Sequence, residues 1–170
     1  MECDKFSALV CSESVRFGAY PTNEDVVHLS AEGFAAILDV TEPADHAKAA
    51  LQNRVLYYEC PSTWSRLHIP LPDRTPGTVD DAKTMVEWVL NILNTTNDGV
   101  YIHCRGGHGR SATIAALVVH ALENTNHLQT IRIIRDVHRT RTIMDPKWRK
   151  LGAPQTQSQK RFIKQWIDTH

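Results

Sequence analysis

Residues 100–111 have the sequence Val-Tyr-Ile-His-Cys-Arg-Gly-Gly-His-Gly-Arg-Ser. A short apolar run ends at His103, three glycines follow within the next six residues, and a second apolar run begins after Ser111. This order predicts a strand, a tight loop and a buried helix. Glycines let a loop backbone approach a ligand closely, and the first N–H groups of a helix are unpaired at the positive end of its dipole. The stretch therefore predicts a phosphate-binding loop.

Cys104 and Arg110 stand at the two ends of this loop. The loop N–H groups and the helix dipole favour the ionised form of a thiol at Cys104, and a thiolate is a good nucleophile. The planar guanidinium of Arg110 can bind two phosphate oxygens at once. We expect Cys104 to attack a phosphorus atom, and Ser111 to donate a hydrogen bond to the sulfur when it leaves. The residues expected to contact the substrate are Arg105, Gly106, Gly107, His108, Gly109 and Arg110.

Hydrophobic periodicity outside the loop predicts the fold class. Short apolar runs bounded by polar, Gly or Pro residues predict strands at residues 35–40, 54–58, 66–71 and 99–103. Apolar residues at helical spacing predict helices at 79–93, 111–122, 128–138 and 156–167. Strands that alternate with helices indicate an α/β fold with a central, mostly parallel sheet flanked by helices.

Length and composition indicate one globular domain. The chain has 170 residues, of which 42% are hydrophobic and 22% charged, so we expect a single catalytic domain over 1–170, with 1–14 as a peripheral extension. No apolar run approaches the length of about 18 residues that a membrane span needs, and the N-terminus lacks the features of a secretion signal. The expected location is the cytoplasm, with the nucleus as the alternative. The oligomeric state stays open.

Charge is balanced over the whole chain but uneven along it. Lys and Arg total 19, and so do Asp and Glu, which gives no general polycation for binding nucleic acid. Residues 22–50 hold six acidic side chains against one lysine, and residues 131–150 hold seven basic against two acidic. These segments are either solvated charged faces or, for the basic one, an approach surface for an anionic substrate.

The four cysteines are Cys3, Cys11, Cys60 and Cys104. They form no Cys-x-x-Cys pair, and outside a secretory context we expect free thiols. A disulfide between Cys104 and either Cys11 or Cys60 under oxidation is the alternative. Cys104 with His103 and His108 makes too few ligands for a zinc site, so we expect no metal and no cofactor.

Residues 103–111 match the pattern His-Cys-x-x-Gly-x-x-Arg-Ser/Thr, and the chain resembles the cysteine-dependent protein phosphatases. Residues 69–76 are similar to the mobile general-acid loop of the small dual-specificity members, with Asp73 placed 31 residues before Cys104. Residues 154–159 are similar to the glutamine loop of the family. The resemblance covers about residues 16–166 and is nearest to the kinase-associated phosphatase group.

The resemblance implies roles for Asp73, for Gln155 or Gln159, and for His103. Asp73 would protonate the leaving group and then accept a proton from water, although it also fits a turn residue. Gln155 or Gln159 would orient that water, but Gln159 also fits a capping box with Thr156. His103 would order the loop or serve as a structural histidine. We expect His108 to line the mouth of the site and to change charge near pH 6 to 7.

The implied function is a dual-specificity protein phosphatase, which hydrolyses phosphoserine, phosphothreonine and phosphotyrosine through a phosphocysteine. Two alternatives on the same fold are an RNA 5′-triphosphatase and a phosphoinositide phosphatase. A third, from another class, is a catalytically silent module that binds phosphoproteins. Cys104, Arg110 and Asp73 are all present, which disfavours the silent module.

Overall fold

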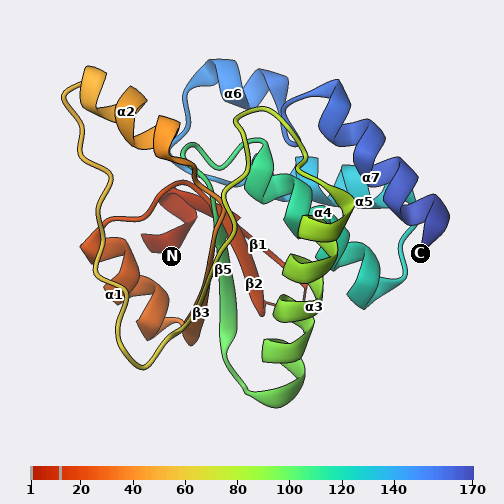
Figure 1. The fold of residues 1–170 in the computed structure, drawn as a ribbon, viewed down its shortest axis with the longest axis horizontal. Coiled ribbons are helices and arrows are strands. Elements are labelled where there is room, and N and C mark those ends of the chain that lie inside the picture. The colour runs from red at the N-terminus through yellow and green to blue at the C-terminus, as the bar shows by residue number, and fades with distance from the viewer. Residues whose placement is uncertain (1, 12) are drawn as a thin grey trace.

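A computed structural model describes residues 2–11 and 13–170 and has a five-stranded sheet at its centre (Figure 1). The strand order is β1-β2-β5-β3-β4. The strands are β1 (Ser7–Val10), β2 (Val15–Gly18), β3 (Phe34–Asp39), β4 (Ser65–His68) and β5 (Gly99–His103). Only β1 runs antiparallel to its neighbour, so the prediction of a mostly parallel α/β sheet is confirmed.

Helices cover both faces of the sheet. One face carries α3 (Val79–Thr95), α4 (Arg110–Glu123), α5 (His127–His138) and α7 (Gln157–Thr169), and the other carries α1 (Asn23–Ala31) (Figure 1). Two shorter helices, α2 (Pro43–Leu51) and α6 (Pro146–Leu151), lie at the end of the sheet where β5 stops and α4 begins. A 3-10 turn, Glu2–Lys5, precedes β1. The loop predicted to bind phosphate therefore lies between these two short helices.

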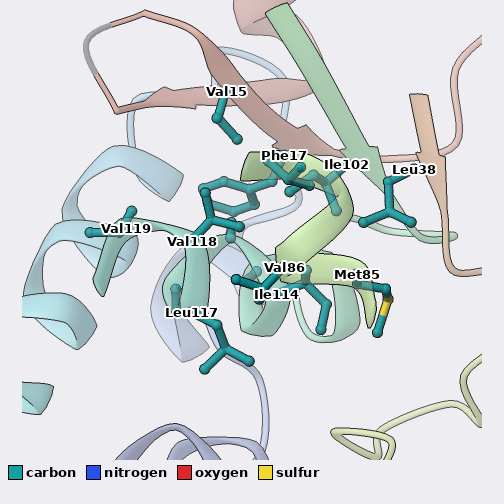
Figure 2. Close-up of a cluster of buried hydrophobic side chains, with 14 of the residues drawn as sticks. Val15, Phe17, Leu38, Met85, Val86, Ile102, Ile114, Leu117, Val118 and Val119 are labelled. Carbon is teal, nitrogen blue, oxygen red and sulfur yellow. The ribbon is translucent and has the colours of Figure 1, made fainter. Parts of the chain in front are cut away.

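Helix α4 is the most deeply buried helix of the fold. Every residue from Arg110 to Val119 is buried. Figure 2 shows Ile114 and Val118 of this helix packed against Phe17 of β2 and Ile102 of β5, with Val86 of α3 beside them. Because α4 is apolar all round from Ile114 to Val119, its burial anchors the loop that precedes it.

One predicted strand, 54–58, is wrong. These residues form no strand, and the side chain of Val55 is 88% exposed. β4 pairs with β3 and forms the edge of the sheet on this side, and residues 54–58 lie outside the sheet although their types favour β structure. Sequence periodicity also missed β1, β2 and the three short helices α1, α2 and α6.

The segment 1–14, expected as a peripheral extension, contributes β1 to the sheet. Arg16 on β2 is fully buried and donates to Asp4 at 2.9 Å and to Glu32 at 2.8 Å. Ser7 on β1 donates in turn to the carbonyl of Cys3 at 2.6 Å. The buried guanidinium thus ties the start of the chain to the C-terminal end of α1.

None of the helices within the described ranges has the length and the apolar character needed to cross a bilayer.

The packing of α4 predicts a contrast between two leucines of the same helix. Leu117 is fully buried, whereas Leu122 is 42% exposed. We expect Leu117→Ala to lower the free energy of unfolding by about 2–5 kcal/mol, because it leaves a cavity beneath the sheet. Leu122→Ala should lower it by less than about 1 kcal/mol. Urea unfolding of both variants followed by tryptophan fluorescence measures the difference, and equal losses would contradict the packing described here.

Candidate active site

The loop 104–109 joins β5 directly to α4, and glycines allow its path. Gly107 has φ +74°, and a Cβ there would lie 2.3 Å from the backbone carbon of Gly18. Gly109 precedes the first residue of α4, and a Cβ there would lie 2.8 Å from Nε2 of Gln159. A larger residue at Gly107 is therefore excluded by backbone strain and by contact with the backbone of Gly18, whereas one at Gly109 would displace the side chain of Gln159.

Cys104 lies at the base of a cavity of about 470 Å³ that this loop lines. Its side chain is 3% exposed, and Sγ accepts a hydrogen bond from the N–H of Gly107 at 3.2 Å. The hydroxyl of Ser111 lies 3.3 Å from the same sulfur and 3.3 Å from the carbonyl oxygen of Gly18. The sulfur thus has the N–H of Gly107 and the hydroxyl of Ser111 within hydrogen-bond distance.

Arg141 orients the loop by binding its backbone carbonyl groups. Its guanidinium is buried and donates to the carbonyl oxygens of Gly106 at 3.2 Å and of Gly107 at 3.3 Å. In a trans peptide the N–H points opposite to the C=O, so these bonds turn the N–H groups of Gly107 and His108 away from Arg141. For Gly107 that direction is toward the sulfur. No local pattern in the sequence links Arg141 to this loop, which lies more than 30 residues away.

Arg110 forms a buried ion pair with Asp45 of α2. Nη1 donates to one carboxylate oxygen at 2.6 Å and Nη2 to the other at 2.9 Å, and Nη1 also donates to the carbonyl of Leu71 at 3.0 Å. Burial opposes ionisation of Asp45, but the hydrogen bonds from Arg110 hold the pKa of that carboxyl below its usual value. The only local feature of Asp45 in the sequence is a capping box with Glu42 at the start of α2, which does not indicate a contact with Arg110.

Asp73 lies beside this ion pair and lines the same cavity as Cys104. Its carboxylate is 3.5 Å from Nη2 of Arg110 and 3.2 Å from Nζ of Lys48. The backbone N–H of Asp73 donates to the carboxylate of Glu42 at 2.8 Å, which fixes the loop that carries it. The side chain stays 29% exposed and so can reach a leaving group in the cavity.

The two predicted glutamines occupy different positions. Gln155 lines the cavity. Gln159 is fully buried and forms a capping box with Thr156, and its Nε2 donates to the carbonyl of Thr75 at 3.3 Å. The amide of Gln159 is therefore engaged in holding α7 and the Asp73 loop, whereas that of Gln155 faces the cavity.

His103 is fully buried at the end of β5. Its Nε2 lies 3.0 Å from the hydroxyl of Tyr58 and 3.8 Å from the carboxylate of Asp39. Burial lowers the pKa of this ring to about 4 despite the nearby carboxylate. The ring is thus neutral at pH 7, and its Nε2 contacts lie with Tyr58 and Asp39 and not with the loop.

His108 lines the cavity but does not titrate near pH 6 to 7, contrary to the sequence-based expectation. Its Nδ1 lies 2.9 Å from Nε2 of His138, and its ring stacks on Trp148 of α6 at 4.6 Å. Burial and the adjacent Arg141 lower its pKa to about 3. The ring therefore acts as a neutral wall of the cavity.

Cys104 is the one cysteine of the described residues that lines this cavity. All four cysteines are free thiols, and burial raises the pKa of Cys3 and of Cys11 to about 12. Over residues 2–11 and 13–170, no cluster of three or more His, Cys, Asp or Glu side chains is arranged to hold a metal ion.

Comparison with known proteins gives matches over most of the chain. One curated relative, named "Putative tyrosine phosphatase 067L" from Invertebrate iridescent virus 3, is 28% identical over 157 residues. The match covers 90% of this chain but 62% of the viral protein, so the chain spans less than two thirds of that relative.

Two solved structures share the fold. Tk-PTP in its active form has a TM-score of 0.68 and 22% identity, with 92% of this chain and 93% of that chain covered. Kinase-associated phosphatase, with its catalytic-site cysteine replaced by serine, has a TM-score of 0.71 and 20% identity, with 96% and 94% covered.

A family model described as "Polymorphic toxin system, DSP-PTPase phosphatase" matches residues 11–122. These residues include the whole parallel sheet, the Cys104 loop, Asp45 and Asp73. The match extends over well more than half of the chain, and the chain therefore belongs to this family of dual-specificity-type cysteine phosphatases.

Proposed function

We propose that this protein removes phosphate from phosphoserine, phosphothreonine and phosphotyrosine in proteins, through a phosphocysteine on Cys104. The observation that carries the proposal is the sulfur of Cys104 at the base of the cavity, with the N–H of Gly107 and the hydroxyl of Ser111 beside it. A buried sulfur with these donors and an adjacent arginine suits attack on a phosphorus atom.

Arg110 keeps donors free for the substrate even though it is paired with Asp45. A guanidinium has five N–H donors, and three of them bond to Asp45 and Leu71. The two that remain, on Nε and on Nη2, form one edge of the planar group, and the carboxylate of Asp73 lies 3.5 Å from Nη2. That edge can bind two phosphate oxygens side by side.

The first step transfers the phosphoryl group to the protein. The thiolate of Cys104 attacks phosphorus in line, the S–P bond forms and the P–O bond to the substrate breaks. Arg110 and the loop N–H groups hold the equatorial oxygens. Asp73 in its protonated form gives its proton to the departing oxygen, which becomes a neutral alcohol or phenol.

The second step releases phosphate. The carboxylate of Asp73 accepts a proton from a water molecule that Gln155 orients, and that water attacks the phosphorus. The S–P bond breaks, and Ser111 donates a hydrogen bond to the leaving sulfur. Inorganic phosphate leaves, and Cys104 returns to its thiolate form.

Protein substrates are proposed on two grounds. The viral relative is named a tyrosine phosphatase, and kinase-associated phosphatase shares the fold. The cavity also opens at the surface with the side chain of Asp73 partly exposed, which leaves room for a phosphorylated segment of chain. We also propose that residues 1–170 form a single catalytic domain. The proposed location is the cytoplasm.

Cys104→Ser tests the nucleophile. We expect the variant to lose more than about a thousandfold in the rate of phosphate release from p-nitrophenyl phosphate, because a serine hydroxyl is scarcely ionised at neutral pH. EDTA should leave the rate of the unaltered protein unchanged. Cys60→Ser, at a half-buried thiol, is the matched control and should retain activity. Turnover that survives Cys104→Ser or that needs a metal ion would refute the mechanism.

Asp73→Asn tests the general acid through the leaving group. The variant should slow phosphate release from phenyl phosphate or phosphoserine peptides at least about tenfold more than release from p-nitrophenyl phosphate, whose phenolate leaves without a proton. Asp80→Asn, an exposed acid in the first turn of α3, is the control. Equal losses on all substrates would show that Asp73 acts in another way.

Asp45→Asn tests the ion pair that positions Arg110. The amide keeps the size of the side chain but removes its charge, and it can no longer accept two charge-assisted hydrogen bonds. We expect kcat/KM for p-nitrophenyl phosphate to fall by about 10- to 100-fold, with weaker inhibition by tungstate, because the guanidinium is no longer held toward the oxyanion. Asp45→Glu should recover part of the loss. A variant that folds and keeps its tungstate affinity would contradict this role.

A further inference from the structure

His108 and His138 form a pair of buried rings beside the phosphate loop. Nδ1 of His108 lies 2.9 Å from Nε2 of His138, and the two rings meet edge to face with their centroids 5.2 Å apart. Burial lowers the pKa of His108 to about 3 and that of His138 to about 4, so each ring carries a single proton at neutral pH. One nitrogen of this contact therefore donates and the other accepts.

The surroundings of His138 decide which ring donates. Nδ1 of His138 is buried and has no hydrogen-bond partner within residues 2–11 and 13–170. A proton on this nitrogen would be a buried donor without an acceptor, which is costly. An unprotonated nitrogen is partly negative instead, which suits a ring that feels the positive charges of Arg141, Arg149 and Arg139. From these contacts we assign the proton of His138 to Nε2, which donates it to Nδ1 of His108.

The other nitrogen of His108 then becomes a donor at the cavity wall. Because Nδ1 accepts, the single proton of this ring is on Nε2. Nε2 lies beside Gly106, where an added Cβ would be 3.4 Å from it. Both residues line the cavity of Cys104, and in the described part of the chain no group accepts a hydrogen bond from Nε2. The wall thus holds an uncharged N–H donor that is free for a substrate.

The stack on Trp148 holds this donor in place. The rings of His108 and Trp148 are nearly parallel, at 13°, with their centroids 4.6 Å apart. Trp148 lies on α6, and its neighbour Arg149 donates to the carbonyl of Arg141 at 2.9 Å, just beyond the end of α5. His138 is the last residue of α5. The ring of His108 is thereby held between the end of α5 and α6, so its donor needs little ordering when a substrate binds.

We propose that His138 holds His108 as an uncharged donor that binds a backbone carbonyl of the substrate next to its phosphorylated residue. The proposal rests on the protein phosphatase activity proposed above, and it makes His108 a specificity-determining residue and His138 a positioning residue. In that reaction the phosphate oxygens are bound by the loop N–H groups and by Arg110, so a further donor on the wall suits the next acceptor of the substrate. In a phosphorylated protein segment that acceptor is a peptide carbonyl, which a simple aryl phosphate lacks.

Nitrogen-15 NMR of the histidine rings tests the proton positions in the unaltered protein. Long-range proton–nitrogen spectra distinguish a ring nitrogen that carries a proton from one that does not, and His108→Phe assigns the signals. We expect the proton of His108 on Nε2 and that of His138 on Nε2 at neutral pH. A proton on Nδ1 of His108 would overturn the proposal.

Two substrates with the same leaving group test the contact with the carbonyl. A phosphotyrosine peptide and p-cresyl phosphate both release an alkylphenol, but the peptide alone has backbone carbonyls. His108→Phe keeps an aromatic ring against Trp148 and removes the donor. We expect the ratio of kcat/KM for the peptide to kcat/KM for p-cresyl phosphate to fall by about three- to tenfold, mainly through KM for the peptide, as for one neutral hydrogen bond. Equal losses on both substrates would overturn the contact with the substrate backbone.

His138→Leu and His138→Gln test the positioning role. Leucine cannot donate to Nδ1 of His108, so the same ratio should fall by at least about threefold. Glutamine offers an amide N–H and should restore the ratio to within about twofold of the unaltered protein. His127→Leu, at the other end of α5, is the control and should keep the ratio. A leucine variant that folds and keeps the ratio would overturn the role of His138.

Binding separates this inference from the proposed function. Fluorescence anisotropy with Cys104→Ser measures the affinity for a labelled phosphotyrosine peptide without turnover, and adding His108→Phe should weaken it at least about threefold. If the unaltered protein releases no phosphate from any peptide but this dependence holds, the proposed activity fails and the inference stands. If phosphate is released from peptides and no variant of His108 or His138 changes the ratio, the inference fails alone.

Discussion

The ion pair between Arg110 and Asp45 holds the site together. Arg110 is the first residue of α4, Asp45 lies at the start of α2, and Leu71, which accepts from the same guanidinium, lies two residues before Asp73. Both charged groups are buried, and removing one partner of such a pair typically costs about 3–5 kcal/mol because the other charge is left without compensation. Helix α4, helix α2 and the loop that carries Asp73 are thereby tied to one another through the guanidinium of Arg110.

Positive charge at the site comes from arginines and not from histidines. His103, His108 and His138 all have pKa values lowered to about 4 or below, first of all by burial, and they stay neutral at physiological pH. Arginine side chains remain charged under the same conditions. The loop therefore presents a constant positive environment to a phosphate, and the histidines contribute shape: His108 stacks on Trp148 and extends the wall of the cavity toward α6.

The sequence predicts the parts of the site that are local and misses those that are distant. The strand, loop and helix at residues 99–123 follow from glycine spacing and an apolar run, and the capping box of Gln159 follows from a four-residue pattern. Asp45 lies 65 residues from Arg110, and Arg141 lies 34 residues from Gly107. Contacts of that separation depend on how helices pack, which no short pattern encodes. The failed strand at 54–58 has the same cause, because whether a run of β-favouring residues joins a sheet depends on tertiary packing, and this run lies outside the sheet.

The uneven charge along the chain also has a structural explanation that composition alone does not give. Among the acids of segment 22–50, Asp45 is buried against Arg110, and Asp39 is buried against His103 and receives a hydrogen bond from Arg66. Among the basic residues of segment 131–150, Arg141 supports the loop carbonyls, and Arg149 donates to the carbonyl of Arg141 at 2.9 Å. Asp45 and Arg141 are therefore not part of a solvated face. They contact different parts of the phosphate loop: Asp45 orients its arginine, and Arg141 orients its peptide groups.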